Sequence, residues 1–209
     1  MELEKELKNA LAELRKTGER KFNQSVDLII NLQKFDPKKN QLSIFINVPF
    51  AVRESRICAF FEAKHKSIET ITPADFRNYS DKKTIKGLVK RFDFFIAQAS
   101  VMPKVASIFG KYLGPAGKMP SPQLGILMDV NDKNIDDLKK RVNNSIKIRI
   151  KEASIKLLIG KQNMKDEEII DNITAVYNAV MKELPKGKEN IKNIEIKFTM
   201  TKPQKIKLK

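Results

Sequence analysis

The spacing of apolar residues changes along this chain, and that change constrains the fold more than any other feature. Apolar and polar side chains alternate in four segments, residues 26–32, 42–48, 146–150 and 194–198. Alternation of this kind is typical of strands with one buried and one solvated face. Between these segments the runs RICAFFEA (56–63) and FDFFIAQAS (92–100) are almost continuously apolar. Such runs are typical of strands buried on both faces.

An insertion is the simplest architecture with this pattern. One α+β domain would be made from residues 1–51 and 146–209, and an α/β domain of residues 52–145 would be inserted into it. Helical spacing of apolar residues predicts helices near the N-terminus and over about 166–184, and residues 73–90 are long enough for a crossover helix. We therefore predict a mixed α+β and α/β fold in two domains, since 209 residues supply two cores.

The segment KYLGPAGKMPSPQ, residues 111–123, contains two Gly and three Pro. These residues disfavour helix and central strand, so we expect a shaped surface loop in which Lys118 supplies charge. The segment is not a phosphate-binding loop. Tyr112 stands where that motif needs Gly, and Met119 where it needs Ser or Thr.

The charge of the chain indicates a polyanionic partner. Lys and Arg number 41 against 25 Asp and Glu, which gives a formal net charge of +16. Nucleic acid and an acidic membrane surface both fit this charge, and a basic surface kept for solubility is the alternative. Residues 197–209 hold five Lys and no acidic residue, which is typical of contact with backbone phosphates.

The residue types of the chain argue against catalysis. The sequence contains one cysteine, Cys58, and one histidine, His65. These are too few for a Cys/His zinc site, and they leave no choice of partners for a Ser/His/Asp catalytic set. Cys58 lies in an apolar run and is expected to be buried in a protein of a reducing compartment. No run approaches the ~20 apolar residues that span a bilayer, and the charged N-terminus does not resemble a signal peptide. We expect no catalytic residue, metal or cofactor, and no membrane association.

The stretch RKFNQSVD, residues 20–27, combines basic, aromatic and small polar side chains at the start of a predicted strand. Aromatic faces stack on bases, and Ser and Asn hydroxyl and amide groups reach 2′-hydroxyls, which is how many proteins recognise RNA. Phe22 as an ordinary core residue is an equally good interpretation of this stretch alone.

Four motifs carry a family resemblance. The stretch DFFIAQASVMPKVASIFGKYLGPAGKMPSP (93–122) resembles the most distinctive part of the large-subunit ribosomal protein "L one" family, in its archaeal and eukaryotic branch. KFNQSVDLIINL (21–32), DNITAVYNAV (171–180) and IEIKFTM (194–200) follow in that family's order and spacing, so the resemblance covers essentially the whole chain.

The resemblance implies a discontinuous domain of split β-α-β topology and an inserted Rossmann-like domain. It implies a cytoplasmic, ribosome-associated protein, monomeric off the ribosome, that binds large-subunit ribosomal RNA at the mobile stalk near the tRNA exit site. Transient contact with exit-site tRNA, help in releasing deacylated tRNA, and repression of translation through the protein's own mRNA are further implications. The implied RNA-binding residues are Lys21, Phe22, Ser25, Asp27, Lys38, Lys39, Thr199, Met200 and Thr201.

The chain departs from the family's pattern in three places. Thr201 stands where the family has Gly, Ala116 replaces a basic residue, and VPFAV (48–52) replaces the usual Pro-His-Gly of the hinge. The first departure bears on one backbone contact with RNA.

Two alternatives to this function stay open at this point. A nucleotide-dependent enzyme using the inserted domain would need a Gly-rich strand-to-helix turn, which the sequence lacks. A stand-alone translational repressor would keep the fold but would not sediment with large subunits.

Overall fold

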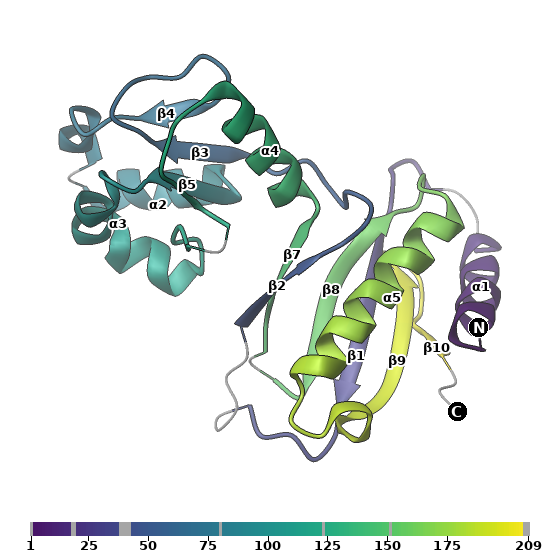
Figure 1. The fold of residues 1–209 in the computed structure, drawn as a ribbon. Coiled ribbons are helices and arrows are strands. Elements are labelled where there is room, and N and C mark those ends of the chain that lie inside the picture. Colours follow the sequence, from purple (N-terminus) through teal and green to yellow (C-terminus); the bar gives the residue numbers. More distant parts are fainter. Residues whose placement is uncertain are drawn as a thin grey trace. The chain divides into compact units, whose positions relative to one another are not determined.

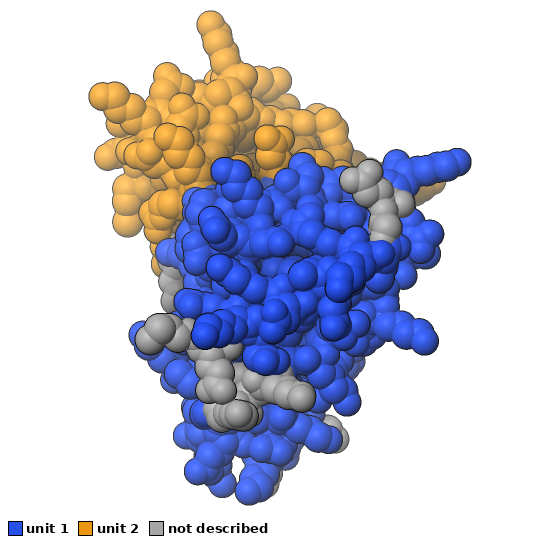
Figure 2. Space-filling view, turned by 90° about the vertical axis from the view of Figure 1, so that its right-hand side faces the viewer, with its two compact units in different colours: residues 1–53, 144–209 blue, residues 54–143 orange. Residues whose placement is uncertain are grey.

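The computed structural model describes residues 2–17, 20–37, 43–79, 81–122, 124–150 and 152–206. The chain divides into two compact units, residues 1–53 with 144–209 (unit 1) and residues 54–143 (unit 2) (Figures 1 and 2). Both units combine helices and strands, so the predicted mixed α/β class is confirmed. No helix within the described ranges has the length and apolar character needed to cross a membrane.

Unit 1 is built on an antiparallel sheet with the strand order β10-β9-β1-β8. Its strands are β1 (Ser25–Leu32), β8 (Ser154–Lys161), β9 (Ile191–Phe198) and β10 (Gln204–Ile206). The helices of the unit are α1 (Glu2–Arg15), α5 (Asp166–Glu183) and the short 3-10 helix η2 (Gly187–Asn190).

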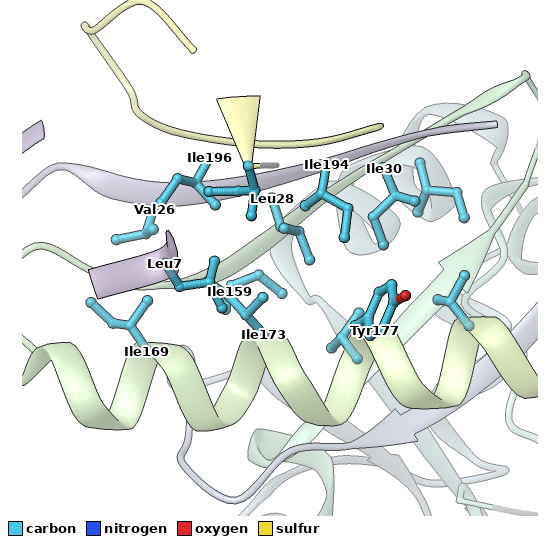
Figure 3. Close-up of a cluster of buried hydrophobic side chains, with 14 of the residues drawn as sticks. Leu7, Val26, Leu28, Ile30, Ile159, Ile169, Ile173, Tyr177, Ile194 and Ile196 are labelled. Carbon is cyan, nitrogen blue, oxygen red and sulfur yellow. The ribbon is translucent and has the colours of Figure 1, made fainter. Parts of the chain in front are cut away.

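The alternating pattern of β1 places its apolar side chains on one face of the sheet. Val26, Leu28 and Ile30 are fully buried, and the residues between them are half-buried. In Figure 3 these side chains and those of β9 face the apolar stripe of α5, and Leu7 of α1 joins the same cluster. Because α1 and α5 both pack on this core face, the polar residues of the other face remain partly accessible.

A two-stranded antiparallel ribbon completes unit 1. It pairs β2 (Ser43–Asn47) with β7 (Ser145–Arg149). The predicted alternating segment 146–150 lies almost entirely in β7, and the apolar residues that follow it form β8, in a different sheet.

Unit 2 has a parallel sheet with the strand order β4-β3-β5-β6. Its strands are β3 (Ile57–Phe60), β4 (Glu69–Ile71), β5 (Phe94–Gln98) and β6 (Ile126–Leu127). Its helices are η1 (Asp75–Tyr79), α2 (Lys82–Arg91), α3 (Met102–Ala116) and α4 (Asp132–Asn143). Residues 58–60 and 95–97 are buried, as their continuous apolar runs predict, and burial raises the pKa of the Cys58 thiol to about 12.

The prediction of an irregular loop over 111–123 is wrong for its first half. Residues 111–116 belong to α3, whose buried stripe of Val105, Phe109 and Leu113 extends the helix into this segment. Pro115 lies in the last turn, and Gly117 ends the helix in the left-handed conformation at φ 68°. Propensity alone overestimated the helix-breaking effect of Gly and Pro here, because tertiary packing holds the stripe in place.

Lys118 has a structural role in place of the expected surface charge. Its ammonium donates hydrogen bonds of 2.7 Å to the backbone carbonyls of Val89 and Phe92, at the end of α2. These are carbonyls that a helix leaves without an internal partner. Lys118 therefore joins the end of α3 to the end of α2.

Candidate nucleic-acid interface

The sheet register of unit 1 brings three distant chain segments together at one end of the sheet. Ser25, the first residue of β1, pairs with Lys161 at the end of β8, and Val26 pairs with Phe198 at the end of β9. We call the surface made by residues 21–27, 161–163 and 199–201 the strand-end surface. It unites two groups of residues that the sequence predicts as RNA contacts, 21–27 and 199–201, although they lie at opposite ends of the chain.

Thr199 extends the pairing of β1 and β9 beyond the last residue of β9. Its backbone N–H donates to the Ser25 carbonyl at 3.1 Å, and its hydroxyl accepts from the Ser25 N–H at 3.0 Å. The side chain of Thr199 remains exposed. The hydroxyl therefore holds two segments together at a position that solvent and a ligand both reach.

Thr201 closes the turn that follows β9. Its hydroxyl accepts from the Phe198 N–H at 2.9 Å, and its own N–H donates to the Phe198 carbonyl at 3.1 Å. Lys34 is the one non-glycine residue in the described ranges with a positive φ, so Thr201 adopts an ordinary backbone conformation. The turn therefore does not require the Gly that the resemblance leads us to expect.

Gln24 is a buried residue beneath this surface that the sequence reasoning missed. It is fully buried, and its side-chain oxygen accepts from the Met200 N–H at 3.1 Å while its nitrogen donates to the Gln162 side chain at 3.2 Å. One amide thus fixes both the turn after β9 and the loop after β8. Position 24 precedes Val26 by two residues, so the alternation of the strand places it on the same inward face as Val26 and Leu28. This spacing could have identified Gln24 as a buried polar residue.

Two large apolar side chains are exposed on this surface. Phe22 is 51% exposed and Met200 is 64% exposed. Phe22 is therefore not a core residue, and both side chains are available to pack against a partner.

Asp27, Lys161 and Lys197 lie on the face of the sheet opposite the core. The Lys161 ammonium donates to the Ser25 hydroxyl at 3.1 Å. Burial raises the pKa of the Asp27 carboxyl, and the charges of Lys197 and Lys161 oppose that effect. A shallow cavity of about 240 Å³ lies on this face, lined in part by Asp27, Ile29 and Lys197.

A second and larger cavity, which we call the hollow, lies at the edge of the strand-end surface and is lined mostly by its residues. Its volume is about 490 Å³, and its lining residues are Arg15, Arg20, Lys21, Phe22, Asn23, Gln162 and Asn163. Lys38 and Lys39, the other predicted phosphate contacts, lie outside the described residues, as do residues 207–209 of the basic C-terminal segment.

The chemistry of this surface is that of binding. It combines hydroxyls, amides, ammonium groups and exposed apolar side chains, and neither Cys58 nor His65 belongs to it. Within the described ranges no group of three His, Cys, Asp or Glu side chains is placed to hold a metal ion.

Comparison with known proteins gives consistent matches along the chain. The model of the Ribosomal protein L1p/L10e family matches residues 14–202. The large ribosomal subunit protein uL1 of Nanoarchaeum equitans is 33% identical over 197 residues, which cover 89% of this chain and 92% of that protein. The uL1 of Thermofilum pendens is 36% identical over 218 residues, covering 98% and 92%, and that of Pyrococcus abyssi is 29% identical over 199 residues, covering 90% and 89%.

Proposed function

The chain belongs to the ribosomal protein L1p/L10e family in its archaeal form, and from this premise we propose that unit 1 binds large-subunit ribosomal RNA through the strand-end surface. The protein is a structural component of the large ribosomal subunit, located with the ribosomes of the cytoplasm. It is not an enzyme, since the family is a structural one.

The observation that carries the proposal is the convergence of the predicted contacts at one end of one sheet. Phe22 and Met200 offer exposed apolar surface for stacking on bases or riboses. Ser25, Asp27 and Thr199 offer hydroxyl and carboxylate groups for 2′-hydroxyls and base edges. Lys21 and Lys161 add positive charge for the phosphates. This combination supports recognition of a particular RNA and not only attraction to any polyanion.

We further infer that unit 1 is the discontinuous RNA-binding domain and unit 2 the inserted Rossmann-like domain. The support is connectivity, since residues 54–143 are contiguous and both chain ends contribute to unit 1. The parallel sheet of unit 2, with β3 between β4 and β5, is consistent with a doubly wound topology.

Three finer functions belong to the same proposal and rest on the family resemblance. We propose that the protein sits at the mobile stalk, contacts exit-site tRNA transiently and assists release of deacylated tRNA. We also propose that the strand-end surface binds the protein's own mRNA and represses its translation. Competition between the mRNA leader and ribosomal RNA for the purified protein tests the last of these.

A matched pair of exposed methionines tests the central proposal. Met200→Asp places a carboxylate on the strand-end surface, and Met128→Asp makes the same change in unit 2, where Met128 is 80% exposed. We expect Met200→Asp to lower the affinity for deproteinised large-subunit ribosomal RNA by at least tenfold, because a carboxylate beside phosphates is repelled. Met128→Asp should bind within about twofold of wild type, because Met128 is exposed but does not belong to the strand-end surface. Equal losses in the two variants would contradict the proposal.

A further inference from the structure

The hollow at the edge of the strand-end surface has the composition of a site for one unpaired nucleotide. Its floor and walls come from the end of α1, the segment before β1 and the loop after β8. These segments lie at the same end of unit 1 in Figure 1. Its volume of about 490 Å³ falls in the range of roughly 300–1,000 Å³ that is usual for sites of small ligands.

One wall of the hollow is fixed by Arg15. Its guanidinium pairs with Asp166 at 2.6 Å and donates to the backbone carbonyls of Gln162 and Met164 at 3.1 and 2.9 Å. Arg15 ends α1 and Asp166 begins α5, so each charge also complements the dipole of its own helix. The loop that carries Asn163 is therefore ordered before any ligand arrives.

Asn163 and Asn23 join this loop to the segment before β1. The Asn23 amide nitrogen donates to the Asn163 side-chain oxygen at 2.9 Å, and the Asn163 backbone N–H donates to the Asn23 side-chain oxygen at 3.3 Å. The Asn163 amide nitrogen has no partner within the described part of the chain. Two N–H donors thus remain for acceptors on a base edge.

The charged and aromatic groups of the hollow are also available. The side chains of Arg20 and Lys21 are exposed and make no ion pair or hydrogen bond among the described residues. Phe22, between them and Asn23, presents half of its surface to solvent. In RNA-binding proteins an aromatic face stacks on a base, cations bind its phosphate and amide groups hydrogen-bond its edge. The hollow offers all three kinds of group.

We propose that the hollow receives a single unpaired nucleotide of the bound RNA, with its base on Phe22, its edge at Asn163 and its phosphate at Arg20 and Lys21. The proposal rests on the proposed function and adds a subsite to it, because Arg20 and Asn163 are not among the residues that the family resemblance implies. A nucleotide in a paired helix does not fit, since its base edge is occupied and both of its faces are stacked.

Tryptophan fluorescence gives a direct test, since the chain contains no Trp. Phe22→Trp creates a single reporter in the hollow, and Met128→Trp creates an exposed control in unit 2. We expect saturating deproteinised large-subunit ribosomal RNA to quench Phe22→Trp emission strongly and to leave Met128→Trp nearly unchanged. Unchanged Phe22→Trp emission in the saturated complex would overturn the proposal.

A second pair of variants tests the base edge. Asn163→Ala removes the free donors. Asn193→Ala removes a member of an Asn pair between β1 and β9, in which the Asn31 amide nitrogen donates to the Asn193 side-chain oxygen at 2.7 Å near the far end of β1. We expect Asn163→Ala to weaken RNA binding about tenfold and Asn193→Ala less than twofold. Equal affinities for the two variants would also overturn the subsite.

The two proposals fail separately in these experiments. If Met200→Asp weakens RNA binding but Phe22→Trp emission and the Asn163→Ala affinity are unchanged, the nucleotide subsite and the stacking role of Phe22 are wrong, and RNA binding by the strand-end surface stands. If the wild-type chain does not bind ribosomal RNA, the proposed function is wrong. Saturable quenching of Phe22→Trp by the four free 5′-ribonucleoside monophosphates would then still support the hollow as a nucleotide site.

Discussion

Replacing Gln24 by leucine should show that a buried amide positions the RNA-binding turn. In Gln24→Leu the Met200 N–H loses its acceptor at 3.1 Å, and the Gln162 side-chain oxygen loses its donor at 3.2 Å. Removal of two hydrogen bonds at about 0.5–1.5 kcal/mol each predicts a decrease of roughly 1–3 kcal/mol in the free energy of unfolding of unit 1. Leucine fills most of the space, so cavity formation adds little to this decrease.

The same substitution should weaken RNA binding in the folded protein. Without the Gln24 amide the Met200 N–H loses its acceptor, so we expect the backbone at Met200 to be less ordered before binding, and ordering one residue on binding costs about 1–2 kcal/mol. That cost corresponds to a dissociation constant about 5–30 times higher. Urea unfolding measures the stability, and filter binding to large-subunit ribosomal RNA at a temperature where unit 1 is folded measures the affinity.

Asn172→Leu is the matched control for Gln24→Leu. Asn172 is equally buried and makes hydrogen bonds of 3.0–3.1 Å to the backbone of Phe50 and Ile159, neither of which belongs to the strand-end surface. It should destabilise unit 1 at least as much and leave RNA affinity unchanged. Wild-type affinity in Gln24→Leu, or an equal decrease of affinity in Asn172→Leu, would refute the positioning role of Gln24.

Stacking, phosphate binding, helix capping and thiol burial can each be tested separately. Phe22→Ala should cost about 1–3 kcal/mol of RNA-binding free energy and leave the slope of log affinity against log salt unchanged, because stacking releases no counterions; a changed slope would contradict the stacking role. Replacing Lys202 and Lys205 by Gln should weaken binding to cognate and unrelated RNA alike. The same change should flatten the slope of log affinity against log salt by about 0.7–0.9 for each phosphate that is no longer neutralised. An unchanged slope would show that the two lysines do not belong to the interface. Lys118→Met should lower the stability of unit 2 by about 1.5–3 kcal/mol, measured by hydrogen exchange at the end of α2, since two carbonyls lose a charged donor; unchanged exchange there would contradict the capping role. Burial raises the pKa of the Cys58 thiol from its ordinary value of 9.0 to about 12, so the unfolded chain loses the thiol proton at a lower pH than the native chain. This group should therefore lower the free energy of unfolding as the pH rises from 9 toward 12. The native thiol should not react with alkylating reagents at pH 8.

The local patterns of the sequence predict the elements of this fold well. Alternation identifies β1 and β9 with their inward residues, and the continuous runs identify β3 and β5 as buried strands. Each of these patterns follows from side-chain geometry within one element, so it can be read without knowing the partner strand. The error at residues 111–116 arose where packing of Phe109 and Leu113 outweighed local propensity.

The geometry of the candidate site could be predicted only in part. The residue types at 21–27 indicate RNA contact and the family resemblance implies it for 199–201, but no local pattern shows that Ser25 and Thr199 bond to each other. The register between segments so distant in sequence is set by the whole sheet. For the same reason the sequence does not show that Arg15 contacts Asp166 or that Asn163 lies beside Asn23. The hollow depends on both contacts.

Site-specific crosslinking tests the central claim most directly. A photoreactive amino acid at position 200, and in a separate protein at position 128, is incorporated and the protein is assembled into large ribosomal subunits before irradiation. Both native side chains are exposed methionines, one on the strand-end surface and one in unit 2. We predict that position 200 crosslinks efficiently to one short segment of large-subunit ribosomal RNA and that Met200→Asp protein fails to compete for it. Efficient RNA crosslinking from position 128 with none from position 200 would contradict the assignment of the interface to unit 1.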